Sequence, residues 1–228
     1  MIRRYEIQTK TSKLIRIGIF YDGSYFFKVS NYYKFGHQRA ARLSLDGIHK
    51  FVRAKVAEFE KVDDQYCHIV EAHYFRGRLS AQTASATDQL EKERIFDDVL
   101  IKTGILTHYL PLDEINYQRP VEKGIDVMLS VEALDLAYQK QFDVVALVAC
   151  DGDYVSLIKK LNGLGTRVML LAWDFSYEYD TGSGSRRKEH TRVSQSLINA
   201  VTYPLMMSQL IDDRTAQRDS LVKSLFVG

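Results

Sequence analysis

The sequence predicts an α/β fold in which a central, mostly parallel sheet lies between two layers of helices. Three apolar runs indicate buried strands, at Leu14–Tyr21, Val144–Cys150 and Val168–Trp173. Segments with helical periodicity lie between these runs, and strands that alternate with helices are typical of βαβ units with right-handed connections. A chain of 228 residues is long enough to form one domain with a sizeable core.

The strands differ in how they are expected to be buried. The run that ends at Tyr21 is followed by an Asp-Gly pair, which predicts a turn after Asp22. Val144–Cys150 has seven consecutive apolar residues, three of them valine, and this favours a central strand covered on both faces. It also ends at an Asp-Gly pair, which begins with Asp151. Weaker strand candidates are Cys67–Phe75 and Ile105–Leu110.

Four helices are expected between the strands. Ser44 or Asp46 is available to cap the first, Gly104 to end the second and Gly163 to end the fourth. The apolar positions that share a helical face are Ile48, Phe51, Val52, Val56 and Phe59 in the first; Leu90, Phe96, Val99 and Leu100 in the second; Ile125, Met128, Leu129 and Leu136 in the third; and Tyr154, Leu157, Ile158 and Leu161 in the fourth.

Three stretches predict loops, and the end of the chain predicts a further helix. The loops are Ser80–Thr87, Leu112–Pro120 and Thr181–Lys188, the last of which is flexible in composition and becomes basic. A terminal helix is expected over Leu205–Leu210 and beyond. The apolar end Leu225–Val227 would pack on the body or on a second copy of the chain, which would form a homodimer.

Composition narrows the class of protein. Lys and Arg number 31 against 29 Asp and Glu, so bulk positive charge does not explain any nucleic-acid binding, although a local basic path remains open. Two cysteines fit a reducing compartment rather than a disulfide framework. No apolar run approaches the roughly 20 residues of a membrane span, and Arg16 interrupts the run that would resemble a signal peptide. We therefore expect a cytoplasmic protein with no membrane partner.

Carboxylates follow the predicted strands. Asp22 directly follows the first strand, Asp151 and Asp153 follow the central one, and Asp126 lies in the first turn of the third helix. Ligands of open parallel sheets bind outside the carboxyl ends of the strands. Carboxylates crowded there would repel one another unless a cation neutralised them, and Mg²⁺ or Mn²⁺ prefers such oxygen ligands. No Cys/His set has the spacing of a zinc site.

Each of these acids also has a structural interpretation. Asp-Gly is a common turn dipeptide, so Asp22 could simply form a turn. Asp153 could cap the helix that it precedes, and Asp126 could complement a helix dipole. Glu132 and Asp135 lie well around the helix from Asp126 and are expected on a solvated face. The histidines, His73 and His108 among them, are interpreted as packing residues, and none is assigned a function.

Taken together, three motifs resemble those of the NYN domain family, and its LabA-like branch most of all. They are Ile19-Phe-Tyr-Asp-Gly-Ser-Tyr25, Lys123-Gly-Ile-Asp-Val127 and Ala149-Cys-Asp-Gly-Asp-Tyr154. The strand that ends Tyr74-Phe-Arg-Gly77 and the segment Leu161–Val168 extend the resemblance. It covers roughly Leu14 to Val201 and implies an N-terminal extension at 1–13, an NYN/PIN-like domain at 14–201 and a C-terminal helical extension at 202–228.

The resemblance implies a PIN-like, Rossmann-like three-layer sandwich and a metal-dependent nuclease, an endoribonuclease, or a relative that has kept the site. Asp22, Asp126, Asp151 and Asp153 would then be the catalytic and metal-binding acids for Mg²⁺ or Mn²⁺. Ser24 would be a neighbouring hydroxyl that orients a ligand water or a carboxylate. The family often has Asn where Tyr25 stands, and a tyrosine cannot replace an amide that both donates and accepts at short reach.

Basic and aromatic side chains are candidates for holding RNA, single-stranded RNA above all. Lys123 and Arg76 are expected to contact a phosphate, and the basic run of Arg186, Arg187 and Lys188 to neutralise others, unless that run is only a surface loop. Exposed aromatic rings after the first motif and before the basic run could stack on unpaired bases, although most aromatic residues are expected in the core. The candidates are Tyr25, Phe26, Tyr32, Tyr33, Phe175, Tyr177 and Tyr179.

The sequence leaves rival functions open. The main alternative is a non-catalytic RNA- or nucleotide-binding regulatory module that has retained the acidic site. A phosphatase with an aspartyl nucleophile would usually have a second acid two residues after the first, where this chain has Ser24. A dinucleotide-binding enzyme is disfavoured because no G-x-G-x-x-G opens a helix after the first strand.

Overall fold

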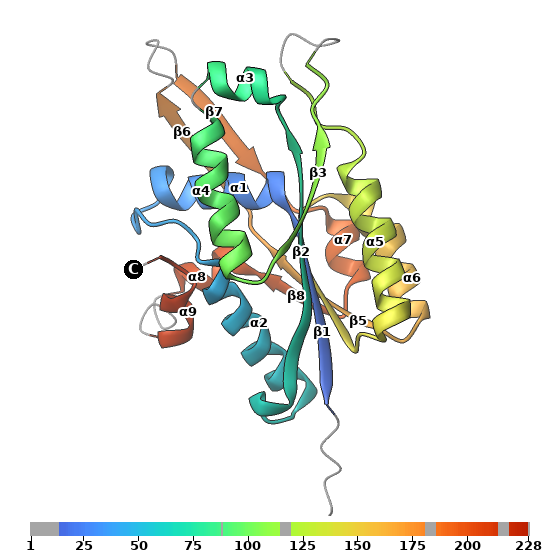
Figure 1. The fold of residues 1–228 in the computed structure, drawn as a ribbon. Helices are drawn as coiled ribbons and strands as arrows, with labels where there is room; N and C mark the ends of the chain where they lie inside the picture. Colours follow the sequence, from blue (N-terminus) through green and yellow to red (C-terminus); the bar gives the residue numbers. More distant parts are fainter. Residues whose placement is uncertain (1–13, 88, 115–119, 181–185, 214–218, 228) are drawn as a thin grey trace, which may run out of the picture.

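A computed structural model describes residues 14–87, 89–114, 120–180, 186–213 and 219–227 of the chain. Its centre is a six-stranded sheet with the order β3-β2-β1-β4-β5-β8, and every neighbouring pair in it is parallel (Figure 1). Helices cover both faces of this sheet, so the predicted three-layer α/β fold is confirmed. No helix within the described ranges is long and apolar enough to cross a membrane.

The elements follow one another in βα alternation. The sheet strands are β1 (Ile15–Asp22), β2 (Cys67–Arg78), β3 (Leu106–Pro111), β4 (Val144–Val148), β5 (Arg167–Ala172) and β8 (Tyr203–Met206), and a separate antiparallel hairpin is formed by β6 (Phe175–Asp180) and β7 (Arg186–Thr191). The helices are α1 (Gly23–Asn31), α2 (Leu45–Glu60), α3 (Ala81–Ala86), α4 (Gln89–Lys102), α5 (Ile125–Lys140), α6 (Val155–Gly163), α7 (Gln195–Ala200), α8 (Met207–Asp212) and α9 (Ser220–Ser224), with short turns of helix at Tyr32–Gly36, Asp64–Tyr66 and Gly152–Tyr154.

The first strand shows why the sheet needs helices on both sides. Ile17, Ile19 and Tyr21 point into a core shared with α1, α2, α4, α8 and α9. Phe20 points into a second core, which is shared with α5, α6 and α7. Successive side chains of a strand face opposite ways, so an apolar run without alternation must be buried on both faces.

The strand order reverses between β1 and β4. From β1 the chain builds outward through β2 and β3, then returns to the other side of β1 and builds outward through β4 and β5. Ile17–Tyr21 pairs residue by residue with Val144–Val148. The carboxyl ends of these two strands therefore lie side by side at the switch point, which is the edge where open α/β sheets bind ligands.

The structure corrects two of the predicted loops. Ser80–Thr87 contains α3, whose first turn is capped by the Ser80 hydroxyl as it accepts from the Thr83 amide at 3.2 Å. A capping serine followed by alanines favours a helix over a loop. Of the predicted loop Thr181–Lys188, residues 181–185 lie outside the described part, but Arg186–Lys188 belong to β7 because they pair with β6. The third, Leu112–Pro120, is described only at its ends.

The predicted terminal helix begins later than expected. Leu205 and Met206 lie in β8, which pairs with β5, and α8 starts only at Met207. A strand of four residues gives little periodicity, and Pro204 is compatible with its place at the edge of the sheet. The proposed domain boundary at residue 201 thus precedes a strand of the main sheet, and the proposed extension at 1–13 lies outside the described residues.

The apolar end of the chain packs on the body. Leu225 is fully buried, its carbonyl accepts from the Ser44 amide at 2.9 Å, and Phe226 bridges to Leu43. These contacts join α9 to the start of α2. A homodimer through this segment stays a prediction.

We predict that Gly18→Ala destabilises the fold by about 1–3 kcal/mol. A Cβ on Gly18 in the central strand β1 would lie 2.6 Å from the buried Phe142 ring. Gly163→Ala is the matched control, because nothing lies within 4 Å of a Cβ at that position, at the end of α6. Urea unfolding of both variants measures the difference, and equal stabilities would contradict the packing argument.

Candidate functional site

Asp22 occupies the junction between β1 and α1. Its Oδ1 atom accepts from the Tyr25 amide at 3.0 Å, so it caps α1. Its Oδ2 atom accepts from the Tyr154 hydroxyl at 3.2 Å. Tyr154 follows β4, so this bond joins the first and third sequence motifs across the switch point. Asp22 is thus both a helix cap and a member of the site.

Asp151 occupies the corresponding junction after β4. Its Oδ1 atom accepts from the Asp153 amide at 3.1 Å and caps the short helical turn that leads into α6. Asp151, not Asp153, is therefore the capping residue. The Asp153 carboxylate is exposed and forms no hydrogen bond or ion pair with the rest of the described chain. It is therefore accessible to solvent next to Asp151.

Asp126 reaches the same place from α5. Gly124 precedes this helix with a φ of 75°, a left-handed conformation that glycine adopts readily, and Asp126 lies in the first turn. Burial raises the pKa of Tyr154, and the carboxylates of Asp22, Asp126 and Asp151 raise it further. The Tyr154 hydroxyl therefore stays protonated as a donor to Asp22, and the charge of three of the four predicted acids acts on it.

Glu122 is a site residue that the sequence analysis missed. Its carboxylate accepts from the Ser24 hydroxyl and from the Gly77 amide, both at 2.5 Å. Glu122 thus joins the start of α1 to the end of β2, next to Asp22. Ser24 does contact a carboxylate, as predicted, although not one of the four predicted acids. Glu122 directly precedes the Lys123 motif, but no spacing rule marked it.

Asp174 is a second missed acid. It follows β5, the neighbour of β4, and its carboxylate accepts from the Val193 amide at 2.6 Å. Its charge acts on Tyr25 and on Cys150, which precedes Asp151. The rule that drew attention to Asp22 and Asp151, an acid directly after a buried strand, applies equally to Asp174.

Charge at the site is only partly balanced. Burial raises the pKa of Asp22, the nearby Glu122 carboxylate adds to this, and the capping bond and Lys28 oppose it. The amino ends of α1 and α5 lie at this edge and carry partial positive charge. Burial and the neighbouring acids also raise the pKa of Cys150 to about 12, so its thiol is not a nucleophile at neutral pH.

The donor set fits a hard divalent cation. Every candidate ligand at the site is a carboxylate oxygen, the type that Mg²⁺ and Mn²⁺ prefer. Within the described ranges, no three of these acids bring their ligand atoms within 4.8 Å of one another. Mg²⁺ usually keeps several waters and is bound through only one or two carboxylates. The arrangement therefore suits an ion held partly through water.

Several of the aromatic residues considered for stacking on bases are buried, in line with the expectation that most aromatic residues are core. Tyr25 is in the core, where its hydroxyl accepts from the Trp173 amide at 2.6 Å and donates to the Trp173 carbonyl at 2.9 Å. Phe26, Tyr33 and Phe175 are also core residues. Tyr25 thus connects α1 to the end of β5, which is a structural contact that explains a tyrosine at this position.

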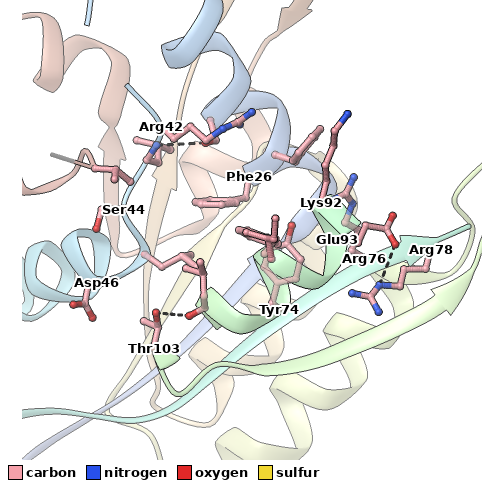
Figure 2. Close-up of a pocket in the computed structure, with 18 of the residues that line it drawn as sticks. Phe26, Arg42, Ser44, Asp46, Tyr74, Arg76, Arg78, Lys92, Glu93 and Thr103 are labelled. Carbon is pink, nitrogen blue, oxygen red and sulfur yellow. Dashed lines mark hydrogen bonds and ion pairs between the residues drawn. The ribbon is translucent and has the colours of Figure 1, made fainter. Parts of the chain in front are cut away.

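The predicted phosphate-binding residues lie in three separate parts of the fold. Arg76 lines a pocket of about 850 Å³ between α1, α2, α4 and β2, and its guanidinium lies 4.4 Å from the centre of the Phe27 ring (Figure 2). Lys123 pairs with Asp113 at 3.2 Å. Arg186, Arg187 and Lys188 are exposed on β7, which Lys28 of α1 contacts through Glu189 at 3.6 Å.

Comparison with known families agrees with this architecture. The family model described as the NYN domain matches residues 16–203. The chain belongs to the NYN domain family. A protein of unknown function from Vibrio parahaemolyticus has a similar structure, with a TM-score of 0.51 and 18% identity over 84% of this chain and 92% of that chain. At this identity the likeness concerns the fold alone. No curated protein matches the chain.

Family membership places the chain among PIN-like nuclease domains. This family assignment agrees with the parallel sheet and with the acids at the carboxyl ends of β1 and β4.

We predict that Asp22→Asn stabilises the cation-free protein more strongly as the pH rises. Asparagine keeps the cap of α1 and removes the buried charge. Burial raises the pKa of Asp22 above about 3.9, its unfolded value. The folded wild type binds the Asp22 proton more tightly than the unfolded chain does, and this stabilises the wild-type fold at low pH. That stabilisation is lost as the pH rises from about 4 through the raised pKa.

The gain in unfolding free energy should reach about 1.4 kcal/mol for each pH unit between the two pKa values. Chemical unfolding in EDTA from pH 4 to pH 8 measures it. Asp135→Asn, at an exposed position on α5, is the control and should show no such trend. A gain for the Asp22 variant that does not change with pH would refute the argument.

Proposed function

We propose that this protein is a metal-dependent ribonuclease that hydrolyses phosphodiester bonds in single-stranded RNA. The observation that carries the proposal is the hydrogen bond from the Tyr154 hydroxyl, after β4, to Asp22, at the end of β1, together with the charge of Asp126 and Asp151 that acts on the same hydroxyl. These acids come from three separate parts of the sequence. Two of them are also helix caps, but capping requires neither the bond across the switch point nor the third acid.

Each acid has a part in the proposed site. Asp22, Asp126 and Asp151 would hold Mg²⁺ or Mn²⁺, directly or through water. When bound, such an ion lowers the pKa of a water, orients it and stabilises charge that develops at phosphorus. Asp153, exposed beside Asp151, would orient the attacking water. Tyr154 fixes the Asp22 carboxylate through its hydrogen bond.

The substrate would approach along the α1 side of the site. Lys28, the half-buried Tyr177 and the exposed basic residues of β7 lie on or next to the hairpin. Arg76 and the Phe27 ring stacked on it present a cation and an aromatic face at the rim of the neighbouring pocket. Cations with adjacent aromatic rings favour an unpaired strand over a duplex.

We further propose that the protein acts in the cytoplasm and belongs to the LabA-like branch of the family. Cys67 and Cys150 are both free, which suits the cytoplasm. The motifs resemble those of the LabA-like branch most.

We predict that Mn²⁺ supports cleavage of single-stranded RNA and that EDTA abolishes it. Asp22→Asn and Asp151→Asn should each lower the rate by at least about 100-fold, because loss of an outer-shell partner alone costs 10–100-fold at metal sites. Asp135→Asn, on the same helix as Asp126, should retain nearly full activity. Cleavage of a labelled oligonucleotide on a denaturing gel measures the rates.

Thermal unfolding of each variant separates loss of chemistry from loss of fold. Activity that survives both substitutions to the extent seen with Asp135→Asn would refute the assignment. RNA binding in EDTA without any cleavage in Mn²⁺ would favour the alternative, a non-catalytic RNA-binding module.

We predict that β7 contributes electrostatic affinity for RNA. Replacing Arg186, Arg187 and Lys188 by alanine should reduce the slope of log K against log salt by up to about 2, because each phosphate contact on a single strand contributes about 0.7. Fluorescence anisotropy with the Asp22→Asn protein measures binding without cleavage. Lys159→Ala with Lys160→Ala, on the exposed side of α6, is the control. Equal slopes for all proteins would exclude β7 from the RNA path.

A further inference from the structure

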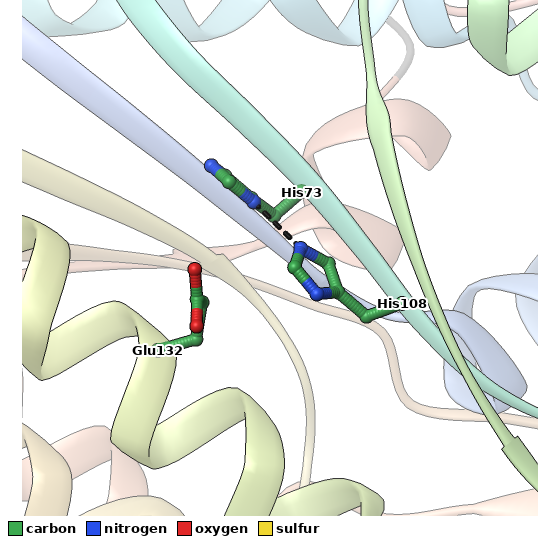
Figure 3. A group of neighbouring side chains, drawn as sticks. All are labelled: His73, His108 and Glu132. Atoms are coloured by element: carbon green, nitrogen blue, oxygen red, sulfur yellow. Dashed lines mark hydrogen bonds between the residues drawn. The ribbon is translucent and has the colours of Figure 1, made fainter.

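Two histidines and a glutamate face one another between the sheet and α5, away from the acidic site. His73 comes from β2, His108 from the neighbouring strand β3 and Glu132 from the second turn of α5 beyond Asp126 (Figure 3). Their potential ligand atoms all lie within 4.8 Å of one another, and they form such a group alone among the described residues.

The sheet and the helix place these side chains by simple periodicity. In the parallel pairing of β2 with β3, His73 is opposite Leu106 and Phe75 is opposite His108, so the two histidines share a face of the sheet. Glu132 lies seven residues after Ile125 and three after Leu129, both of which are buried. It therefore lies on the covered face of α5, and the expectation that it is solvated is wrong. Asp135 is exposed as expected.

The two imidazoles are held in position from several sides. The Nδ1 atom of His73 and the Nε2 atom of His108 are 2.9 Å apart. Phe20 stacks on His73 with ring centres 5.3 Å apart, and Phe75 stacks on His108 at 4.3 Å. His73 is only 2% exposed. The rings therefore have little freedom to turn away from each other.

A second carboxylate stands behind His73. The Oε2 atom of Glu71 is 3.3 Å from the His73 Nε2 atom, and the Oε1 atom of Glu71 pairs with Lys140 at 3.2 Å. A carboxylate behind a ligating histidine commonly fixes its ring and its tautomer. The Nε2 atom of His73 lies beside Glu71 without a hydrogen bond, and the Nδ1 atom of His73 faces His108.

We propose that His73, His108 and Glu132 bind one zinc ion. Two imidazoles and one carboxylate, with a fourth position for water, are a common zinc ligand set. Tetrahedral Zn–N bonds of about 2.05 Å place two nitrogens about 3.3 Å apart, so the histidines need to separate by only a few tenths of an ångström from 2.9 Å. Mg²⁺ and Mn²⁺ prefer oxygen ligands and would go to the acidic site instead.

A purely structural interpretation is a hydrogen-bonded pair of neutral histidines. Burial lowers the pKa of both rings, so each has a nitrogen lone pair at neutral pH. In that interpretation, however, the Glu132 carboxylate is half-buried without a hydrogen bond or ion pair to the described chain. A cation would supply its missing partner and would join β2, β3 and α5. Since α5 begins with the Asp126 turn, zinc would also hold that turn against the sheet.

The test is zinc binding by the full chain after EDTA treatment and dialysis. Isothermal titration with ZnCl₂ and metal analysis should give one tight site in the wild type, and thermal unfolding should shift upward by about 5–10 °C at 100 times the dissociation constant. His108→Gln and Glu132→Gln should each weaken this site at least about 10-fold and remove most of the shift. Both residues are half-buried, so these changes are milder than one at His73.

Matched controls come from the same elements. His68→Gln on the exposed face of β2 and Asp135→Asn on α5 should bind zinc as the wild type does. Asp22→Asn should also retain the site, which separates this proposal from the ribonuclease proposal. Visible absorption after Co²⁺ substitution should show a tetrahedral site that His108→Gln loses. Three results would each overturn the proposal: no tight site in the wild type, zinc binding by His108→Gln and Glu132→Gln as tight as in the wild type, or loss of the site in Asp22→Asn.

Discussion

The parallel pairing of β1 with β4 is the contact on which the rest of the molecule depends. Ile17–Tyr21 and Val144–Val148 are fully buried from both sides and run in register to the same edge. Because the strand order reverses here, the chain leaves the two strands toward opposite faces of the sheet, into α1 on one and α6 on the other. Two segments more than a hundred residues apart in sequence thereby deliver their aspartates to one place. The free energy gained by the hydrophobic cores on this pair of strands offsets the repulsion between the carboxylates.

That approach is stabilised by groups that also build the fold. Asp22 and Asp151 each use one oxygen to cap the helical turn that follows, so local structure fixes their orientation before any ligand arrives. The amino ends of α1 and α5 oppose part of the negative charge, and the protonated Tyr154 hydroxyl donates a hydrogen bond to Asp22. The negative charge that remains unbalanced affects Asp22 most, and burial raises the pKa of this residue. A site whose acids are oriented by caps, partly exposed and short of positive charge is suited to a hydrated cation.

Helix α5 connects the two regions of chemical interest. Asp126 lies in its first turn and Glu132 about 9 Å further along, at 1.5 Å per residue. The same helix packs Leu129 and Ala133 against the sheet. A small displacement of α5 would therefore alter both the acidic site and the contact of Glu132 with the histidines. The two groups differ in ligand chemistry, oxygen in one and mainly nitrogen in the other, so the proposed sites would select different cations.

The sequence by itself determined the layered α/β class, the buried strands that end at Asp22 and Asp151, and the acids that follow them, because these depend on apolar runs and local turn signals. It could not determine contacts that exist only after strands pair. Glu122 has no local signature and joins the site by bridging Ser24 and Gly77. Arg186–Lys188 have a loop-like composition and become a strand because β6 lies beside them. His73, His108 and Glu132 meet because the β2–β3 register and the face of α5 bring them together, and neither register nor packing face is fixed by any one segment alone.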